Sequence, residues 1–207
     1  MTDVSRALEQ LDEIHTRIAR SNVYRGWRSL PVALSGLAGL AAAWMQPAAA
    51  GAIAPRGWVL YWIGTATVAF GIGCAHLMWK YFSEESTAAK RRTQEVLSQF
   101  LPSLAAAAII TVGLMRLDPT QAGLLPGIWA ACFSLGIFAA RPFLPTASAA
   151  IAMYYGAAAM AMLWSAHTLN AHSGWLVGGV FAAGQLMAAA VLYWSLERSS
   201  SGVLNNE

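Results

Sequence analysis

The stretch from Leu11 to Trp44, "LDEIHTRIARSNVYRGWRSLPVALSGLAGLAAAW", changes from a charged segment to an apolar one without an intervening linker. In its first half, apolar residues recur three and four positions apart, which is the spacing of one face of an α-helix. Its second half carries no Asp, Glu, Lys or Arg after Arg28. Such a junction is typical of an amphipathic helix at a membrane surface that leads directly into a membrane-spanning helix.

The composition of the whole chain points the same way. Of its 207 residues, 57% are hydrophobic and 11% are charged, whereas soluble proteins have about a quarter charged residues. The charges gather mainly in residues 3–28 and 80–95, which leaves long uncharged blocks between them. A water-soluble fold of this size would lack polar surface, so the sequence predicts a membrane protein.

Apolar blocks of about 17 to 25 residues predict membrane-spanning helices. Six such blocks are found, at 31–50, 58–79, 101–115, 124–140, 143–163 and 175–196. The third is short, and Arg116 ends it because this side chain would cost about 3 kcal/mol at the bilayer centre. We therefore expect an all-α, integral membrane bundle of six helices over residues 31–196, with a cytoplasmic helical loop at 80–100. An amphipathic cytoplasmic or interfacial helix with its elbow (1–30) precedes the bundle, and a disordered cytoplasmic tail (197–207) follows it.

The orientation follows from the basic residues on alternate sides of the six spans. Only Arg56 and Arg116 fall on one side, and the other side carries Arg6, Arg17, Arg20, Arg25, Arg28, Lys80, Lys90, Arg91, Arg92, Arg141 and Arg198. Positive residues favour the cytoplasmic side. We expect a multi-pass protein of the bacterial inner membrane with both termini in the cytoplasm. Tryptophans support this topology, because eight of them lie near predicted span ends: Trp27, Trp44, Trp58, Trp62, Trp79, Trp164, Trp175 and Trp194.

The amphipathic segment offers a candidate docking surface for a protein partner. Its apolar stripe includes Leu8, Leu11, Ile14 and Ile18. The stripe indicates only that something covers it, and the membrane surface or residues 80–100 would be the simplest cover. A soluble cytoplasmic protein is the alternative. The basic triplet Lys90 to Arg92 is balanced by three nearby glutamates, so direct binding of nucleic acid is not predicted.

Few polar groups are predicted at depth in the membrane. They are His76, Tyr154, Tyr155 and Gln185. We expect them to make interhelical contacts, with a small-molecule pocket as the alternative. All ten acidic residues lie outside the spans, which argues against an ion-coupled transporter. His167 and His172 share an outer loop without a carboxylate or thiol beside them, so the sequence predicts no metal, cofactor or catalytic site.

Small residues recur in the spans at the spacing that lets helices approach closely. The pairs are Ser35 with Gly39, Gly123 with Gly127 and Gly174 with Gly178, and a row is formed by Ser148, Ala152 and Gly156. These faces predict a compact bundle or a homo-oligomer.

Several short motifs resemble a known group of proteins. "ALSGLAGL" (33–40), "TAAKRR" (87–92), "GLLPGIW" (123–129) and the glycine-rich last span resemble predicted six-helix bacterial membrane proteins often encoded beside a small winged-helix transcription regulator. The resemblance covers roughly residues 8–194. Members tend to carry a histidine in the last span, where this chain has Gln185. The activity of that group is not established, so the resemblance implies a regulatory neighbourhood and no reaction.

Two functions are compatible with these features. The first is a non-enzymatic membrane scaffold or sensor whose amphipathic helix engages a soluble cytoplasmic partner, for example a transcription regulator. The second is a passive channel or carrier for a small neutral or lipophilic molecule. We expect a sealed interior for the first and a continuous polar or open path for the second.

Overall fold

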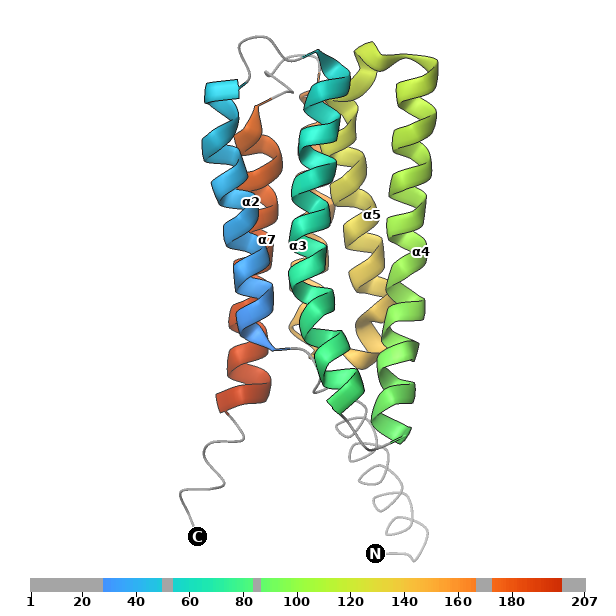
Figure 1. Ribbon diagram of the computed structural model, residues 1–207, viewed down its shortest axis with the longest axis vertical. Coiled ribbons are helices and arrows are strands. Elements are labelled where there is room, and N and C mark those ends of the chain that lie inside the picture. The colour runs from blue at the N-terminus through green and yellow to red at the C-terminus, as the bar shows by residue number, and fades with distance from the viewer. Residues whose placement is uncertain (1–27, 50–53, 84–86, 167–172, 199–207) are drawn as a thin grey trace, which may run out of the picture.

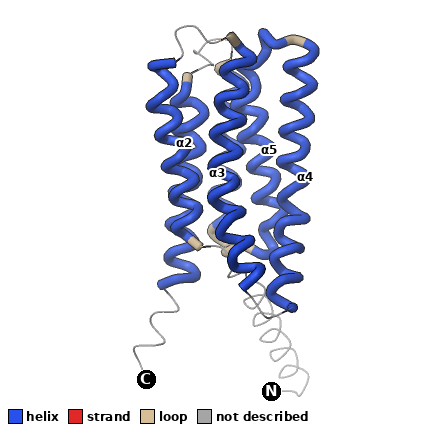
Figure 2. The backbone as a smooth tube through the Cα atoms, viewed as in Figure 1, coloured by secondary structure: helices blue, strands red, loops and turns tan. Residues whose placement is uncertain are grey.

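The computed structural model describes residues 28–49, 54–83, 87–166 and 173–198, which form a bundle of six helices along one long axis (Figure 1). The α-helices are α2 (Ser29–Ala49), α3 (Pro55–Ser83), α4 (Thr87–Leu117), α5 (Leu125–Ala140), α6 (Ser148–Trp164) and α7 (Val180–Leu192). Short 3₁₀ turns precede and follow α5, namely η2 (Pro119–Leu124) and η3 (Arg141–Phe143). Turns of π-helix flank α7, namely η4 (Trp175–Gly179) and η5 (Tyr193–Glu197). The described residues contain no strand (Figure 2), so the predicted all-α fold with six helices is confirmed.

Five of the helical segments have the length and apolar composition needed to cross a membrane, and the sixth, α6, is a shorter apolar helix. The expected fifth span at 143–163 begins later than the sequence suggested, at Ser148. Pro142 and Pro145 explain the delay, because proline lacks an N–H and disfavours helical geometry in the residue before it. With 17 residues, α6 is about 26 Å long at 1.5 Å per residue.

The boundaries of the third span also differ from expectation. Residues 87–100, predicted as part of a separate helical loop, belong to the same 31-residue helix as the span, and Pro102 lies inside it. In the same region α3 continues to Ser83, beyond the predicted end at residue 79. The two helices therefore extend on either side of residues 84–86, which lie outside the described residues. Also outside them are residues 1–27, with the candidate docking residues Leu8, Leu11, Ile14 and Ile18, and the tail from 199 onward.

The first and last described helices lie side by side. Most of the packing in the bundle occurs where α2 meets α7 and α3, and where α5 meets α4 and α6. The start of α2 and the end of α7 lie at one end of the bundle (Figure 1), which we call the inner end. The outer end is where α2 ends and α3 begins. An even number of helices places the first and last described residues at the same end.

Small residues create the closest helix contacts, as predicted. At Gly178, an added Cβ would collide with the main-chain oxygen of Gly39, so α2 and η4 approach backbone to backbone. On α6, the main-chain oxygen of Ala152 accepts a hydrogen bond of 2.7 Å from the Ser134 hydroxyl of α5. Gly127 faces Leu163 of α6, whereas its predicted partner Gly123 belongs to the 3₁₀ turn η2.

Candidate functional site

Two adjacent tyrosines attach α6 to α7. The hydroxyl of Tyr154 donates a hydrogen bond to the main-chain oxygen of Val180 at 3.0 Å, and that of Tyr155 donates to the oxygen of Phe181 at 3.1 Å. The Tyr155 side chain is 1% exposed. Its ring lies against Gly184 so closely that an added Cβ there would collide with the ring. Both hydroxyls make the interhelical contacts that the sequence suggested, and Gly184 provides the room for one of the rings.

Aromatic rings fill the space around Tyr155. Its ring centroid lies 4.9 Å from that of Phe133, 5.3 Å from that of Phe181 and 5.4 Å from that of Tyr154. Phe133 also meets Phe100 of α4 at 5.3 Å. The cluster thus joins α4, α5, α6 and α7 near the middle of the bundle. Aromatic rings occupy the space beside the two tyrosines, where the alternative prediction was a small-molecule pocket.

The two other candidate residues do not join the tyrosines. Gln185 faces α2, since a Cβ added at Gly36 would lie 2.9 Å from the Gln185 Cβ. His76 lies in the inner half of α3, and its Nε2 atom is buried without a hydrogen-bond partner in the described part of the chain. No hydrogen bond or ring contact among the described residues links His76 or Gln185 to either tyrosine. The four candidates therefore do not converge on one site.

The sequence did not predict a polar and aromatic cluster that lies at the outer end. Gln46 of α2 is 3% exposed, and its Oε1 accepts a hydrogen bond of 2.8 Å from the indole Nε1 of Trp62. Nearby, the Tyr61 hydroxyl donates to the main-chain oxygen of Ala42 at 2.6 Å. The only signal available was a glutamine near the end of an otherwise apolar block.

The same cluster corrects the interpretation of two tryptophans. Trp58 and Trp62, expected at the lipid headgroups, are each 3% exposed and belong to the core. Trp58 stacks on Trp129 of α5 with ring centroids 6.1 Å apart, and Trp129 donates a hydrogen bond of 2.8 Å to the Thr111 hydroxyl of α4. A tryptophan near a span end is thus drawn inward when a neighbouring helix offers an acceptor or a stacking partner. Three other tryptophans at the outer end are exposed, as expected for rings at a membrane interface: Trp44, Trp164 and Trp175.

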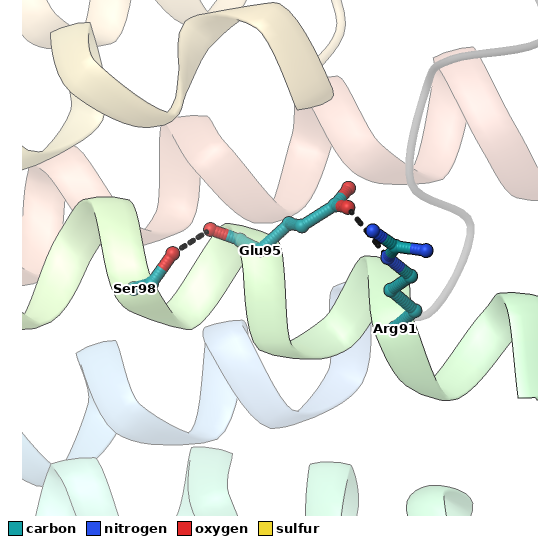
Figure 3. A network of polar contacts seen from close by, with 3 residues as sticks. All are labelled: Arg91, Glu95 and Ser98. Carbon is teal, nitrogen blue, oxygen red and sulfur yellow. Dashed lines mark hydrogen bonds and ion pairs between the residues drawn. The ribbon is translucent and has the colours of Figure 1, made fainter.

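Charged groups at the inner end interact weakly with one another. Within α4, Arg91 Nε lies 3.6 Å from Glu95 Oε1, one turn away (Figure 3). The hydroxyl of Ser98 donates to the main-chain oxygen of Glu95 at 2.8 Å. Lys90 lies 5.5 Å from the centre of the Tyr81 ring of α3. Because the Arg91 side chain is 82% exposed, this ion pair stabilises the helix by a few tenths of a kcal/mol at most.

At the outer end, Asp118 organises the turn between α4 and α5. Its Oδ1 accepts hydrogen bonds from the Thr120 main-chain nitrogen at 3.0 Å and from the Thr120 hydroxyl at 2.5 Å. These bonds lower the pKa of the Asp118 carboxyl below its ordinary value. The contact is a helix cap, and it starts the 3₁₀ turn η2.

No group of three or more His, Cys, Asp and Glu side chains that could hold a metal ion exists among the described residues. His167 and His172 lie outside them. Both cysteines, Cys74 and Cys132, are free. A scan of protein-family models and searches of curated proteins and solved structures find no match to this chain.

Proposed function

We propose that the protein is a non-enzymatic scaffold or sensor embedded in the bacterial inner membrane, with both ends of the chain in the cytoplasm. Embedding is supported by the apolar surface of the bundle. Large apolar side chains lie exposed along α3 and α4, among them Leu60, Val68, Phe70, Met78, Ile109 and Val112. Such a surface would be an aggregation liability in water, and it is the expected surface in contact with lipid tails.

The distribution of exposed arginines supports the orientation. Arg28, Arg91, Arg141 and Arg198 are exposed at the inner end, and Arg56 and Arg116 are exposed at the outer end. The inner end therefore carries more of the positive charge that favours the cytoplasmic side.

The observation that carries the proposal is the filled interior of the bundle. At the outer end, Trp58, Trp62 and Leu125 pack into one buried cluster, and the rings around Tyr155 fill the middle. Buried polar groups there bond to one another or to the backbone, as Gln46 does with Trp62 and Ser134 with Ala152. A core of this kind favours a structural or signalling role over a permeation path, because the buried residues that the structure describes are mostly apolar.

A membrane scaffold needs a surface that meets its partner, and the amphipathic helix at residues 1–30 is our candidate. The partner would be a soluble cytoplasmic protein that covers Leu8, Leu11, Ile14 and Ile18. A transcription regulator is one such protein, because the membrane proteins that this chain resembles are often encoded beside one. We expect no direct contact with nucleic acid.

The test is a pull-down of the intact protein from mild detergent. Leu11→Asp with Ile14→Asp places two charges in the apolar stripe and should abolish capture of the partner. Insertion should persist, because it depends on the spans. The matched control, Thr2→Asp with Thr16→Asp, adds the same charges away from the stripe at helical spacing and should leave capture intact. Identical partner profiles for the parent and both variants would reject docking through this helix.

One observation favours the second function, passive passage of a small neutral or lipophilic molecule. The unpartnered Nε2 of His76 lies one helical turn from Gly73, beside which a Cβ would find no atom within 4 Å. If this region admits a solute, liposomes containing the protein should release small neutral solutes faster than empty liposomes, and His76→Leu should change that rate. Equal leakage from protein-containing and empty liposomes would reject passage.

A further inference from the structure

One face of α3 is buried at its outer end and uncovered in its inner half. Residues three and four positions apart share one face of a helix. On α3 such a row consists of Val59, Trp62, Ala66, Phe70, Gly73, Leu77 and Tyr81. Val59 and Trp62 are each 3% exposed. Further along, Ala66 is exposed, Phe70 is 45% exposed, and a Cβ added at Gly73 would meet no atom of the described residues within 4 Å. The row therefore loses its cover about halfway along the helix.

A row on α4 meets this face at both of its ends. The row consists of Gln94, Leu97, Leu101, Leu104, Ala108, Thr111 and Met115. At the inner end, the Gln94 amide donates a hydrogen bond of 3.3 Å to the Tyr81 hydroxyl. At the outer end, Met115 packs against the buried cluster that contains Trp62. Between these two points α3 and α4 have few contacts, and Leu101 is 46% exposed. The two helices are therefore joined at both ends and open between them.

We call this opening the seam. Its lining is apolar and consists of Ala66, Phe70 and Gly73 of α3 and Leu101, Leu104 and Ala108 of α4. Arg56, exposed at the outer end, marks one edge of the proposed membrane span. At 1.5 Å per residue, Ala66 lies about 15 Å from Arg56 along α3, and Leu77 lies about 32 Å from it. Since the hydrocarbon core is about 30 Å thick, the seam spans its cytoplasmic half, which is the depth of the acyl chains of one leaflet.

The two ends of the seam differ in polarity. At the inner end, the Lys90 amine lies 5.5 Å from the centre of the Tyr81 ring, beside the hydrogen bond from Gln94. At the outer end, the buried cluster around Trp62 closes the seam with apolar and aromatic side chains. A molecule that fills the seam therefore has its polar end toward the cytoplasm, beside a positive charge, and its apolar end toward the middle of the membrane.

We propose that the seam binds one acyl chain of an anionic phospholipid of the cytoplasmic leaflet. The chain lies between α3 and α4 along Phe70 and Leu101, where contact with two helices replaces contact with other lipid chains. The phosphate accepts a hydrogen bond from the Lys90 amine. The cytoplasmic leaflet supplies anionic lipids, which basic residues at its surface attract. The inference rests on the proposed membrane embedding and orientation.

The experiment measures the lipid that the full-length protein retains. Nanodiscs of phosphatidylcholine mixed with phosphatidylglycerol are prepared, and the lipids that remain bound after the protein is released are identified by native mass spectrometry. The parent should retain one phosphatidylglycerol. Gly73→Leu places a side chain in the seam and should abolish this retention. Lys90→Gln should lower the preference for phosphatidylglycerol on the order of fivefold, the effect of one basic residue beside an anionic surface.

Matched variants separate the seam from the rest of the surface. Gly71→Leu adds the same side chain to α3 at almost the same depth, but two residues turn it by about 200°. No described atom lies within 4 Å of a Cβ at Gly71 either, so this variant should retain the lipid like the parent. Arg116→Gln removes a charge from the outer end and should keep the parental preference. If Gly73→Leu fails to insert, Ala108→Leu fills the seam from α4 and should abolish retention in its place.

A photoreactive lipid locates the bound chain. Phosphatidylglycerol with a diazirine in its acyl chain should label Leu101 or Leu104 in the parent and in Gly71→Leu, and this labelling should be lost in Gly73→Leu. Unchanged labelling in Gly73→Leu would place the chain elsewhere and overturn the site.

The remaining results distinguish this site from the proposed function. Equal retention by the parent and Gly73→Leu would overturn the lipid site and leave the embedding intact, as would equal loss in Gly71→Leu. Release of the parent as a dimer that Gly73→Leu converts into a monomer would show that a second copy fills the seam, and would also overturn the lipid site. Failure of the parent to insert into the nanodiscs would overturn the membrane embedding, and the lipid site with it.

Discussion

The Tyr155 ring of α6 lies directly on Gly184 of α7, and its hydroxyl reaches past this glycine to the main-chain oxygen of Phe181, 3.1 Å away. Gly184 and Tyr155 form a single contact between α7 and α6. A side chain at position 184 would occupy the space of the ring, so ring and hydrogen bond depend together on the absence of a Cβ.

We therefore expect Gly184→Ala to destabilise the bundle, because the Tyr155 ring and its aromatic neighbours must shift. Overpacking of a core costs about 1 to 3 kcal/mol. Gly64→Ala is the control, since nothing lies within 4 Å of a Cβ added there, and it should keep or slightly raise stability by helix propensity. Thermal unfolding in detergent measures both variants. Equal midpoints would show that Tyr155 does not depend on Gly184.

A second prediction concerns the buried pair Gln46 and Trp62. Gln46→Leu should leave the indole N–H of Trp62 without this acceptor in a buried position, which costs about 1 to 3 kcal/mol. Trp62→Phe removes the donor as well as part of the ring. In a double-mutant cycle, the loss from Gln46→Leu should be smaller when position 62 is already Phe. Additive losses in thermal unfolding would argue against a direct contribution from the hydrogen bond.

A third prediction follows from the cap at Asp118. Its folded-state pKa is lowered, so the carboxylate contributes stability above its unfolded pKa and loses that contribution as the pH falls through the folded value. Asp118→Ala should therefore lower the unfolding midpoint at neutral pH, and the gap to the parent should close in acid. Thermal unfolding from pH 7 downward measures the gap. A gap that stays constant to acid pH would mean that the carboxylate charge is not involved.

The topology supplies a fourth prediction. In a variant without Cys74 and Cys132, single cysteines at Ala89 and Ser200 should react with a membrane-impermeant reagent only from the cytoplasmic side, and one at Asn170 only from outside. The reason is the excess of arginine at the inner end. Intact cells and inverted membrane vesicles give the two sides. Labelling of position 89 in intact cells would contradict the orientation.

The sequence predicted the number of helices and most helix-packing faces, because long apolar blocks and small residues four apart are local signals. It missed where α4 begins, since the charged residues before Pro102 resemble a loop although they extend the same helix. It also missed the burial of Trp58, Trp62 and Gln46, which depends on α2, α3 and α5 meeting at the outer end. Hydropathy and spacing indicate which face of a helix is packed, but not which distant segment packs on it.

The pairing of α2 with α7 also affects the order in which the bundle can assemble during synthesis. The first described helix, α2, packs mainly on the last, α7. Gly178 can therefore pack on Gly39 and Ala43 only after the ribosome has made nearly the whole bundle. Until then, the small-residue face of α2 lacks the helix that covers it in the finished bundle. A ribosome that stalls before Trp175 would leave α2 packed on α3 alone, with the face around Gly39 uncovered.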